Sequence, residues 1–354
     1  MRKEIAVIKG DYIGPEIVTE AMKVMERTAE VFGHRFHFEE VLMGGSAIDA
    51  CGSCLPEATL EKCLASDSVL LGAVGGPKWD KVDKNNRPEK GLLKLRSGMK
   101  LYANLRPAKI FPQLASASPL RPESVQAGID LMIVRELTGG IYFGSHSTAL
   151  EKGQKVATDV MSYSEVEIER IMRVGFETAR KRSCNLVSVD KSNVLDCSRL
   201  WAEVAHRVAA DYPDVTLRDM LVDNAAMQLV RDPSQFDVIV TENMFGDILT
   251  DEASVISGSL GMLSSASVGA EVALFEPIHG SYPQAAGKNI ANPMATILSA
   301  AMLLEHLGLD AEGKAVRRAV DKALADGIVT EDLAVAGGRA YSTSEVGDYV
   351  AKNV

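Results

Sequence analysis

Short apolar runs alternate along the chain with longer segments whose apolar positions recur at helical spacing. Ile5 to Ile8, Ser68 to Val74 and Ile129 to Glu136 are mostly apolar, and each is short enough to be a buried strand. The segment after the first run, through about Phe32, has the apolar period of a helix, with Pro15 in its first turn. This alternation predicts an α/β fold with a large, mostly parallel mixed sheet.

The same alternation predicts most of the other elements. We expect strands at 36–42, 185–191, 214–222 and 236–240, and helices at 56–64, 164–182, 196–211, 224–231, 293–307 and 313–326. Residues 141–143 are expected to continue the strand that ends at Glu136, and 154–163 to form an extended arm. No internal repeat or Pro-rich linker is visible, so two domains would be interwoven rather than joined by a tether.

Composition excludes several classes of function. The chain has 354 residues, 46% hydrophobic and 24% charged, which suits about two globular domains. Its net charge of −10 argues against nucleic-acid or anionic-membrane partners. No apolar run approaches the ~20 residues of a membrane span, and no targeting segment is visible, so we expect a cytoplasmic location.

The charge is distributed unevenly. Between Lys78 and Lys109 there are ten basic and three acidic residues, which gives that window a charge of +7 and the rest −17. The window is either a solvated basic face or an anion-binding site. The five cysteines are expected to be reduced, and the Cys51–Cys54 spacing has no partner pair that would make a zinc or redox site.

Two aspartates follow the apolar run that ends at Val240. Asp247 and Asp251 are four residues apart, so on a helix they share one face. Two stacked carboxylates suit Mg²⁺ or Mn²⁺ if a third acid joins them, and Asp223, after another predicted strand, is the candidate. The alternative is an ordinary solvated helix face.

Three arginines lie at positions that could bind carboxylates. Arg96 lies on a probable helix, Arg106 follows Asn104-Leu, and Arg135 ends an apolar strand. A guanidinium group matches a carboxylate, so together they could hold a substrate with two carboxylates. Each could equally belong to an ordinary ion pair.

Lys191 is expected at the carboxyl end of a strand, where ligands bind in α/β sheets. Near cations such a lysine can lose its proton and serve as a base. Tyr142, just after Gly139-Gly140, could be the matching acid, or else an aromatic at the rim of the site. Neither a Gly-x-Gly-x-x-Gly fingerprint nor a complete P-loop is present, so the fold is not a classical Rossmann fold.

Taken together, these segments resemble the isocitrate/isopropylmalate dehydrogenase family of β-decarboxylating dehydrogenases, nearly from end to end. The matching motifs include Gly10-Asp-x-Ile-Gly-Pro-Glu16, Glu89-Lys-Gly-Leu-Leu-Lys-Leu-Arg96, Arg135-Glu-Leu-Thr-Gly-Gly-Ile-Tyr142, Asp190-Lys-Ser-Asn193 and Asn243-Met-Phe-Gly-Asp247. So many matches in the same order are highly specific. The resemblance implies the two-domain fold of that family, with residues 1–101 and 258–354 as the dinucleotide-binding domain. Residues 102–257 would bind substrate and metal and dimerise, with an arm at about 141–164.

The resemblance also implies roles for individual residues. Lys191 and Tyr142 would be catalytic, and Asp223, Asp247 and Asp251 would hold Mg²⁺ or Mn²⁺. The substrate-binding residues would be Arg96, Arg106, Arg135, Asp223, Glu89, Leu92 and Leu93. The two leucines fit an isopropyl group and offer nothing to a third carboxylate, which favours isopropylmalate over isocitrate. NAD would be bound by Gly76, Pro77, Lys78, Glu89, His279, Gly280, Ser281, Gln284 and Asn292.

The implied activity is NAD-dependent oxidation and decarboxylation of 3-isopropylmalate in leucine biosynthesis, by a homodimer in which Lys191 and Asp223 reach the partner's site. A malate or tartrate dehydrogenase of the same family, or an inactive dinucleotide-binding regulator, are the alternatives. Two positions depart from the family pattern. Tyr12 replaces a common glycine, and Gln284 replaces the aspartate that NAD-using relatives commonly carry, so selectivity against NADP is expected to be looser.

Overall fold

The protein folds as two compact units in the computed structural model, which describes residues 1–258, 260–334 and 337–354. Unit 1 comprises Met1–Leu101 and Ser259–Val354, and unit 2 comprises Tyr102–Gly258. Among the described residues each unit contains five α/β strands that pair with one another. In each unit four strands are parallel and one is antiparallel, which confirms the predicted mostly parallel, mixed α/β architecture.

Unit 1 is built on strands in the order β2-β1-β3-β12-β11, with only β11 antiparallel to its neighbour. The strands are β1 (Arg2–Gly10), β2 (Arg35–Glu40), β3 (Ser68–Ala73), β11 (Ser264–Val268) and β12 (Ala273–Pro277). The helices are α1 (Gly14–Phe32), α2 (Gly45–Cys51), α3 (Glu57–Ala65), α4 (Pro88–Gly98), α10 (Met294–His306), α11 (Asp310–Ala325) and α12 (Thr343–Asn353).

Alternate side chains of the unit 1 strands bury on opposite faces of the sheet. Ile8 and Leu71 pack in a cluster with Leu95 of α4. On the other face a Cβ at Gly72 would lie 2.8 Å from a methyl group of Val18 in α1, so that glycine allows the helix to approach β3 closely.

Unit 2 is built on strands in the order β4-β5-β10-β8-β9, with only β4 antiparallel to its neighbour. The strands are β4 (Ala103–Lys109), β5 (Asp130–Glu136), β8 (Asn185–Asp190), β9 (Thr216–Leu221) and β10 (Val238–Thr241). The helices are α5 (Pro122–Gln126), α6 (Glu165–Arg180), α7 (Asp196–Ala209), α8 (Val222–Arg231) and α9 (Asn243–Ile256). Short 3-10 turns lie at Pro77–Trp79, Lys84–Asn86, Pro112–Ala117, Pro233–Gln235, Leu260–Met262 and Pro283–Ala285.

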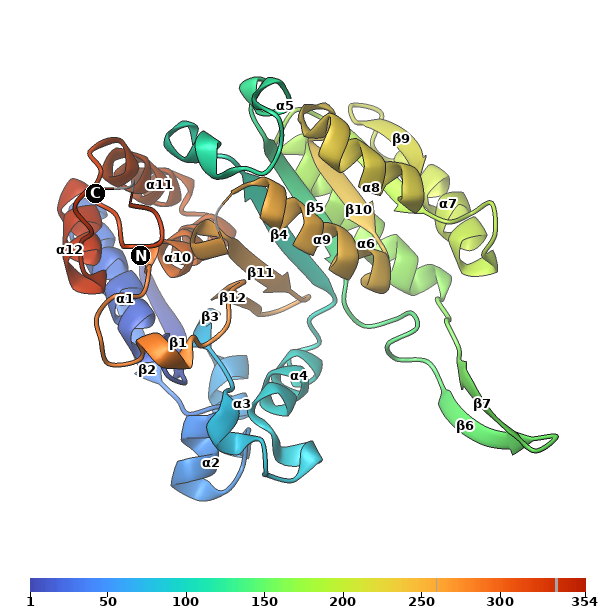
Figure 1. The fold of residues 1–354 in the computed structure, drawn as a ribbon, viewed down its shortest axis with the longest axis horizontal. Helices are drawn as coiled ribbons and strands as arrows, with labels where there is room; N and C mark the ends of the chain where they lie inside the picture. The colour runs from blue at the N-terminus through green and yellow to red at the C-terminus, as the bar shows by residue number, and fades with distance from the viewer. Residues whose placement is uncertain (259, 335–336) are drawn as a thin grey trace. The chain divides into compact units, whose positions relative to one another are not determined.

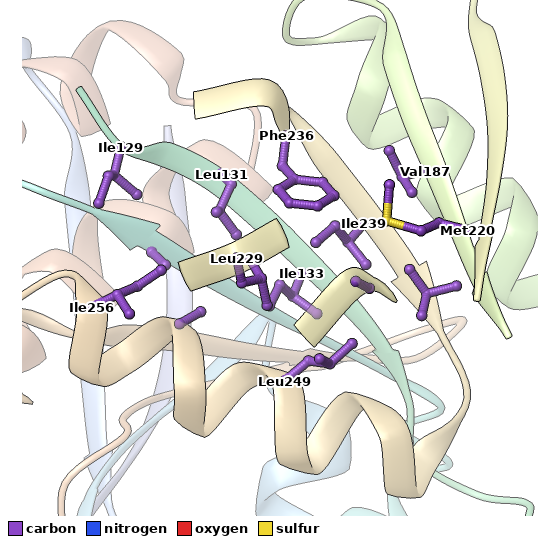
Figure 2. Packing of buried hydrophobic residues seen from close by; sticks show 14 of the residues in the cluster. Ile129, Leu131, Ile133, Val187, Met220, Leu229, Phe236, Ile239, Leu249 and Ile256 are labelled. Carbon is purple, nitrogen blue, oxygen red and sulfur yellow. The ribbon is translucent and has the colours of Figure 1, made fainter. Parts of the chain in front are cut away.

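The core of unit 2 lies between the sheet and helices α8 and α9. Ile133, Val187 and Ile239 come from three neighbouring strands and meet Leu229 and Leu249 from the two helices (Figure 2). Because successive strand side chains point to opposite faces, the residues next to these in sequence face α6 instead. This core fixes the position of α9 beside β5.

A β-hairpin extends from unit 2 before α6 (Figure 1). It consists of β6 (His146–Glu151) and β7 (Gln154–Asp159), and all twelve strand residues are exposed. Lys152 and Gly153 both have positive φ, 48° and 80°, as a type I′ turn requires. The predicted extended arm is therefore one strand of a hairpin whose first strand was not anticipated.

The helices and strands expected around unit 2 agree with the structure to within a few residues, but two predictions were wrong. Residues 141–143 form a turn closed by Phe143 N–H and Gly144 N–H on Gly140 O, not a strand. Asp223 does not directly follow a strand that ends at Val222, because β9 stops at Leu221 and Asp223 lies in the first turn of α8. No helix among the described residues is long and apolar enough to cross a membrane.

Candidate active site

The register of the unit 2 sheet brings the ends of its parallel strands to one edge. Arg135 of β5 is opposite Thr241 of β10, which is opposite Val189 of β8. The next strand pairs Leu221 with Asp190 in the same direction. The segments that leave these strands, which include the start of α9, Lys191 and the start of α8, therefore emerge at the same edge.

Arg135 is the buried centre of this edge. Its Nη1 donates to Asp247 Oδ1 at 2.6 Å, and its Nε and Nη2 donate to the side-chain oxygen of Asn243 at 3.1 and 2.9 Å. Its side chain crosses α9 at Gly246, where a Cβ would lie 2.5 Å from Arg135 Cγ. Gly246 is therefore required for the arginine to reach Asp247.

Tyr142 approaches the same carboxylate from the turn after Gly140. Its hydroxyl donates to Asp247 Oδ2 at 2.9 Å. Burial, and then the hydrogen bond to Asp247, raise the pKa of Tyr142 above its ordinary 10.0. The hydroxyl therefore keeps its proton at neutral pH, as a proton donor must.

Arg106 contacts the next turn of α9. Its Nη1 donates to Thr250 Oγ1 at 3.0 Å and lies 3.4 Å from Asp251 Oδ1. Its Nε donates to Asn104 Oδ1 at 2.8 Å. We call Arg106, Arg135, Tyr142, Asp247 and Asp251 the α9 cluster; the structure brings all five together on one helix face.

Lys191 and Asp223 form a second pair. Lys191 Nζ lies 2.6 Å from Asp223 Oδ1, because the two residues follow the aligned strands β8 and β9. The lysine holds the pKa of Asp223 below its ordinary 3.8. Within the described chain no three His, Cys, Asp or Glu side chains are close enough to hold a metal, so Asp223 does not join Asp247 and Asp251 here.

The predicted substrate-pocket residues of unit 1 lie on α4. Arg96 Nη2 contacts Glu276 Oε1 at 2.5 Å, while its Nε is buried without a hydrogen-bond partner in the described structure. Leu92 packs partly against the unit 1 core, Leu93 is 48% exposed, and Glu89 is exposed. An orphaned guanidinium N–H is a vacant site for an anionic oxygen.

Asp11 organises the first loop predicted to bind the dinucleotide. Its buried carboxylate accepts hydrogen bonds from the backbone N–H groups of Gly45, Ser46 and Gly75, at 2.8 to 2.9 Å. Gly75 and Gly76 both have positive φ, so the chain can turn sharply there. Asp11 is not among the predicted site residues, although its position between Gly10 and the Gly14-Pro15 turn is a signal for it.

Side-chain-to-backbone hydrogen bonds hold the second predicted cofactor loop to the first loop and to α1. Ser281 Oγ donates to Gly75 O at 2.8 Å. Glu16, in the first turn of α1, accepts from Gly287 N and Asn289 N at 2.6 and 3.0 Å. Glu16 was missed as a functional residue because its partners are about 270 residues away in sequence.

Within this loop the predicted cofactor side chains differ in whether their polar atoms have partners. His279 Nε2 is buried and without a partner among the described residues, and burial lowers the pKa of this histidine. Gln284 lies in a 3-10 turn, and Asn292 Nδ2 donates to Asp332 at 3.1 Å. Gly76, Pro77, Lys78 and Gly280 lie in the same two loops.

Tyr12, at the position where the resemblance implies glycine, has a strained backbone conformation. Its φ is 52°, in the left-handed region where glycine is favoured. Its ring packs edge-on against Trp79, with ring centres 5.6 Å apart, and lies over Gly76. The aromatic contacts offset backbone strain of about 1 kcal/mol.

Comparisons with known proteins place these features in a known context. Residues 4–350 match the family model described as isocitrate/isopropylmalate dehydrogenase. A 3-isopropylmalate dehydrogenase of Geobacillus kaustophilus is 59% identical over 97% of this chain and 93% of its own. One from Helicobacter hepaticus is 54% identical over the full length of both chains.

Solved structures agree with the sequence comparison. An isocitrate dehydrogenase from Methylococcus capsulatus has a TM-score of 0.84 at 34% identity and covers 99% of both chains. A β-decarboxylating dehydrogenase from Thermococcus kodakarensis has a TM-score of 0.82 at 37% identity, over 99% of this chain and 96% of its own.

Proposed function

The chain belongs to the isocitrate/isopropylmalate dehydrogenase family, and we propose that it is an NAD-dependent 3-isopropylmalate dehydrogenase. The reaction oxidises the 2-hydroxyl group and releases the β-carboxylate as CO₂, which serves leucine biosynthesis in a cytoplasmic enzyme. The observation that carries the proposal is the α9 cluster, in which two arginines and a protonated tyrosine surround two carboxylates.

The residues present fit the two implied cofactors. Asp247 and Asp251 offer the carboxylate oxygens that Mg²⁺ and Mn²⁺ prefer, and Asp223 of a second protomer would supply the third. When bound, the metal polarises the substrate oxygens and NAD accepts the hydride. The orphaned Nε2 of His279 and the backbone of the two glycine-rich loops would hold the dinucleotide.

The chain's own side chains perform the binding and proton transfers. Arg96, Arg106 and Arg135 hold the two substrate carboxylates. The buried Nε of Arg96 can donate a hydrogen bond to one of them. Lys191 would accept the hydroxyl proton, directly or through a relay, after nearby cations have favoured the loss of its own proton, because the ammonium that pairs with Asp223 cannot accept one. Tyr142 supplies the proton to the carbon left by CO₂, because its hydroxyl is protonated and lies beside Asp247 in the α9 cluster.

Substrate choice would rest on α4. Leu92 and Leu93 present apolar surface next to Glu89 on one turn of the helix, which suits an isopropyl group. Isocitrate would place a third carboxylate there without a cationic partner. The resemblance implies a Lys-Tyr pair at the position of Gln284 in NADP-using isocitrate relatives. NAD is expected over NADP because Gln284 and Ala285 stand there instead, although neutral Gln284 repels a 2′-phosphate less than aspartate would.

We propose that the active form is a homodimer with shared sites. Met227 and Val230 on α8, and Ile248 and Val255 on α9, are 62%, 47%, 58% and 63% exposed and recur at helical spacing. Such an apolar stripe on two adjacent helices suits burial against a second copy. Lys191 and Asp223 would then complete the partner's site.

The test is turnover of purified protein with NAD and Mn²⁺. We expect NADH production on 3-isopropylmalate, at a kcat/KM well above that on D-malate, tartrate or isocitrate, and abolition by a chelator. Preference for malate or tartrate would assign the chain to a sister activity. Absence of turnover on all four acids would favour a dinucleotide-binding regulator and refute the proposal.

A further inference from the structure

A buried polar network lies directly behind the α9 cluster. Its centre is Tyr163, which precedes the N-cap of α6 and is 9% exposed. The Tyr163 hydroxyl is 3.2 Å from Glu242 Oε2 and 3.4 Å from Glu136 Oε2, and both carboxylates are buried. None of these three residues has a role in the proposed chemistry.

The tyrosine hydroxyl also accepts a hydrogen bond. Asn243 N donates to it at 3.1 Å. Asn243 is the first residue of α9, and a first-turn N–H has no acceptor within its own helix. The hydroxyl therefore satisfies that N–H, while its single proton goes to a carboxylate.

Asn243 transmits this anchoring to Arg135. Its side-chain oxygen accepts from Arg135 Nε and Nη2, its amide nitrogen donates to Gly139 O at 3.2 Å, and its backbone oxygen accepts from Arg135 Nε at 3.0 Å. The guanidinium orientation toward Asp247 thus depends on where Asn243 is held.

The ring of Tyr163 supports the turn that carries Tyr142. A Cβ at Gly139 would lie 2.5 Å from Tyr163 Cε1, and one at Gly140 would lie 2.5 Å from its hydroxyl. The Gly139-Gly140 pair therefore leaves room for the ring against the turn. Glu136 holds the same turn by accepting from Thr138 N and Gly139 N, at 2.9 and 2.7 Å.

We propose that Tyr163 is a positioning residue for the substrate-binding arginine, acting through Asn243. The inference rests on the proposed function for the identity of the substrate. It predicts that removing only the hydroxyl weakens binding of the substrate carboxylate and leaves dinucleotide binding unchanged, because the predicted cofactor residues belong to unit 1 and this network belongs to unit 2.

The experiment compares Tyr163→Phe with Tyr212→Phe. Tyr212 is a matched control, since it is also buried in unit 2 but stacks on Phe176, with ring centres 4.7 Å apart. For Tyr163→Phe we expect kcat/KM for isopropylmalate to fall about tenfold, KM for NAD to stay within about twofold, and amide exchange at Asn243 to accelerate. Tyr212→Phe should change none of these.

A double-mutant cycle identifies the route of action. Asn243→Ala keeps the backbone N–H but removes the side chain that holds Arg135. If Tyr163 acts through that side chain, adding Tyr163→Phe to Asn243→Ala lowers kcat/KM less than about twofold further. Full additivity of the two effects would overturn the proposal.

The amide-exchange measurement separates this proposal from the proposed function. Wild-type protein without turnover would refute the function, and exchange at Asn243 would still decide the Tyr163 proposal, because it needs no substrate. Unchanged exchange in Tyr163→Phe overturns the proposal whatever the turnover. Unchanged kcat/KM in an active enzyme overturns it as well.

Discussion

At the scale of single residues, Gly246 determines whether Arg135 can reach Asp247. In Gly246→Ala the new methyl group would lie within 2.8 Å of Arg135 Cβ and closer to Cγ, so the arginine must move. We expect a folded protein that is destabilised by about 1–3 kcal/mol through overpacking. Its kcat/KM for isopropylmalate should fall at least about tenfold.

Steady-state kinetics and thermal unfolding check this prediction. Gly175→Ala is the control. A Cβ at this helical glycine of α6 would lie 3.2 Å from Val240 Cβ, and Gly175 is not in the α9 cluster. The control should keep wild-type kinetic constants. A Gly246→Ala enzyme with an unchanged KM for the substrate would show that the orientation of Arg135 does not matter for binding.

The placement of individual residues was predictable where one short motif determines it. The spacing of Asp247 and Asp251 implied a shared helix face, and the structure places both beside arginines. The long-range partners were not predictable. Neither Asn243 nor Gly246 carries a charge, and their contacts with Arg135 are 108 residues or more apart, so no local pattern marks them.

At the scale of elements, Glu16 joins the start of α1 to the second cofactor loop. Glu16→Ala removes a carboxylate that accepts two backbone hydrogen bonds, at Gly287 and Asn289. Charge-assisted bonds of this kind contribute about 1.5–3 kcal/mol. We therefore expect KM for NAD to rise about tenfold or more, with little change in stability of unit 2.

The matched control is Glu26→Ala, an exposed acid on the same helix. It should leave both KM values unchanged. If Glu16→Ala behaved like this control, the loop that contains Gln284 would not need its attachment to α1, and the predicted cofactor role of that loop would lose its support.

Asp237 joins three elements at the opposite, amino-terminal edge of the unit 2 sheet. Its carboxylate accepts from Arg182 Nε at 2.7 Å and from Ser183 N at 2.9 Å. Burial alone would raise the pKa of Asp237, but these hydrogen bonds outweigh it and hold the pKa below the ordinary 3.8. The unfolded chain therefore binds this proton more readily than the native chain.

Stability from Asp237 is thus present above pH 3.8 and is lost as the pH falls through the lower native pKa. We expect Asp237→Asn to lower the free energy of unfolding by about 1.5–3 kcal/mol at neutral pH, since Arg182 then keeps only Asp130 as a carboxylate partner. The difference should shrink below pH 3.8. Denaturant titrations at pH 7 and pH 3 measure it, and a difference independent of pH would contradict the pKa assignment.

Helices and strands were predictable from periodicity where one apolar face of the element packs on the core. The helix expected at 164–182 is observed as Glu165–Arg180, because its apolar stripe packs on the sheet. Strands β4 and β11 were not anticipated. β4 contains Arg106 and Pro107, and β11 reads Ser-Ser-Ala-Ser-Val, so their partners in the sheet, rather than their own hydrophobicity, make them strands.

At the scale of the whole molecule, the described chain lacks a complete metal site, although it holds every predicted ligand. Asp247 and Asp251 belong to the α9 cluster, whereas Asp223 pairs with Lys191. A site completed by a second protomer reconciles these facts with the family activity. It also predicts that two inactive variants can complement each other. In a mixed dimer both defects would fall in one of the two sites, and the other site would be intact.

Asp247→Asn would remove a proposed metal ligand from a protomer's own site, while Lys191→Ala would remove the proposed base that it lends to its partner. Each homodimer should have less than about 1% of wild-type activity. In a mixed dimer one site combines both defects and the other has none. Unfolding and refolding the variants together in equal amounts makes about half the dimers mixed, so activity should return to about a quarter of wild type.

Mixing without refolding is the control, and should restore activity only as fast as subunits exchange. If refolded mixtures stayed inactive while wild type treated identically recovered, Lys191 would have to act within its own protomer, and a shared site would be excluded.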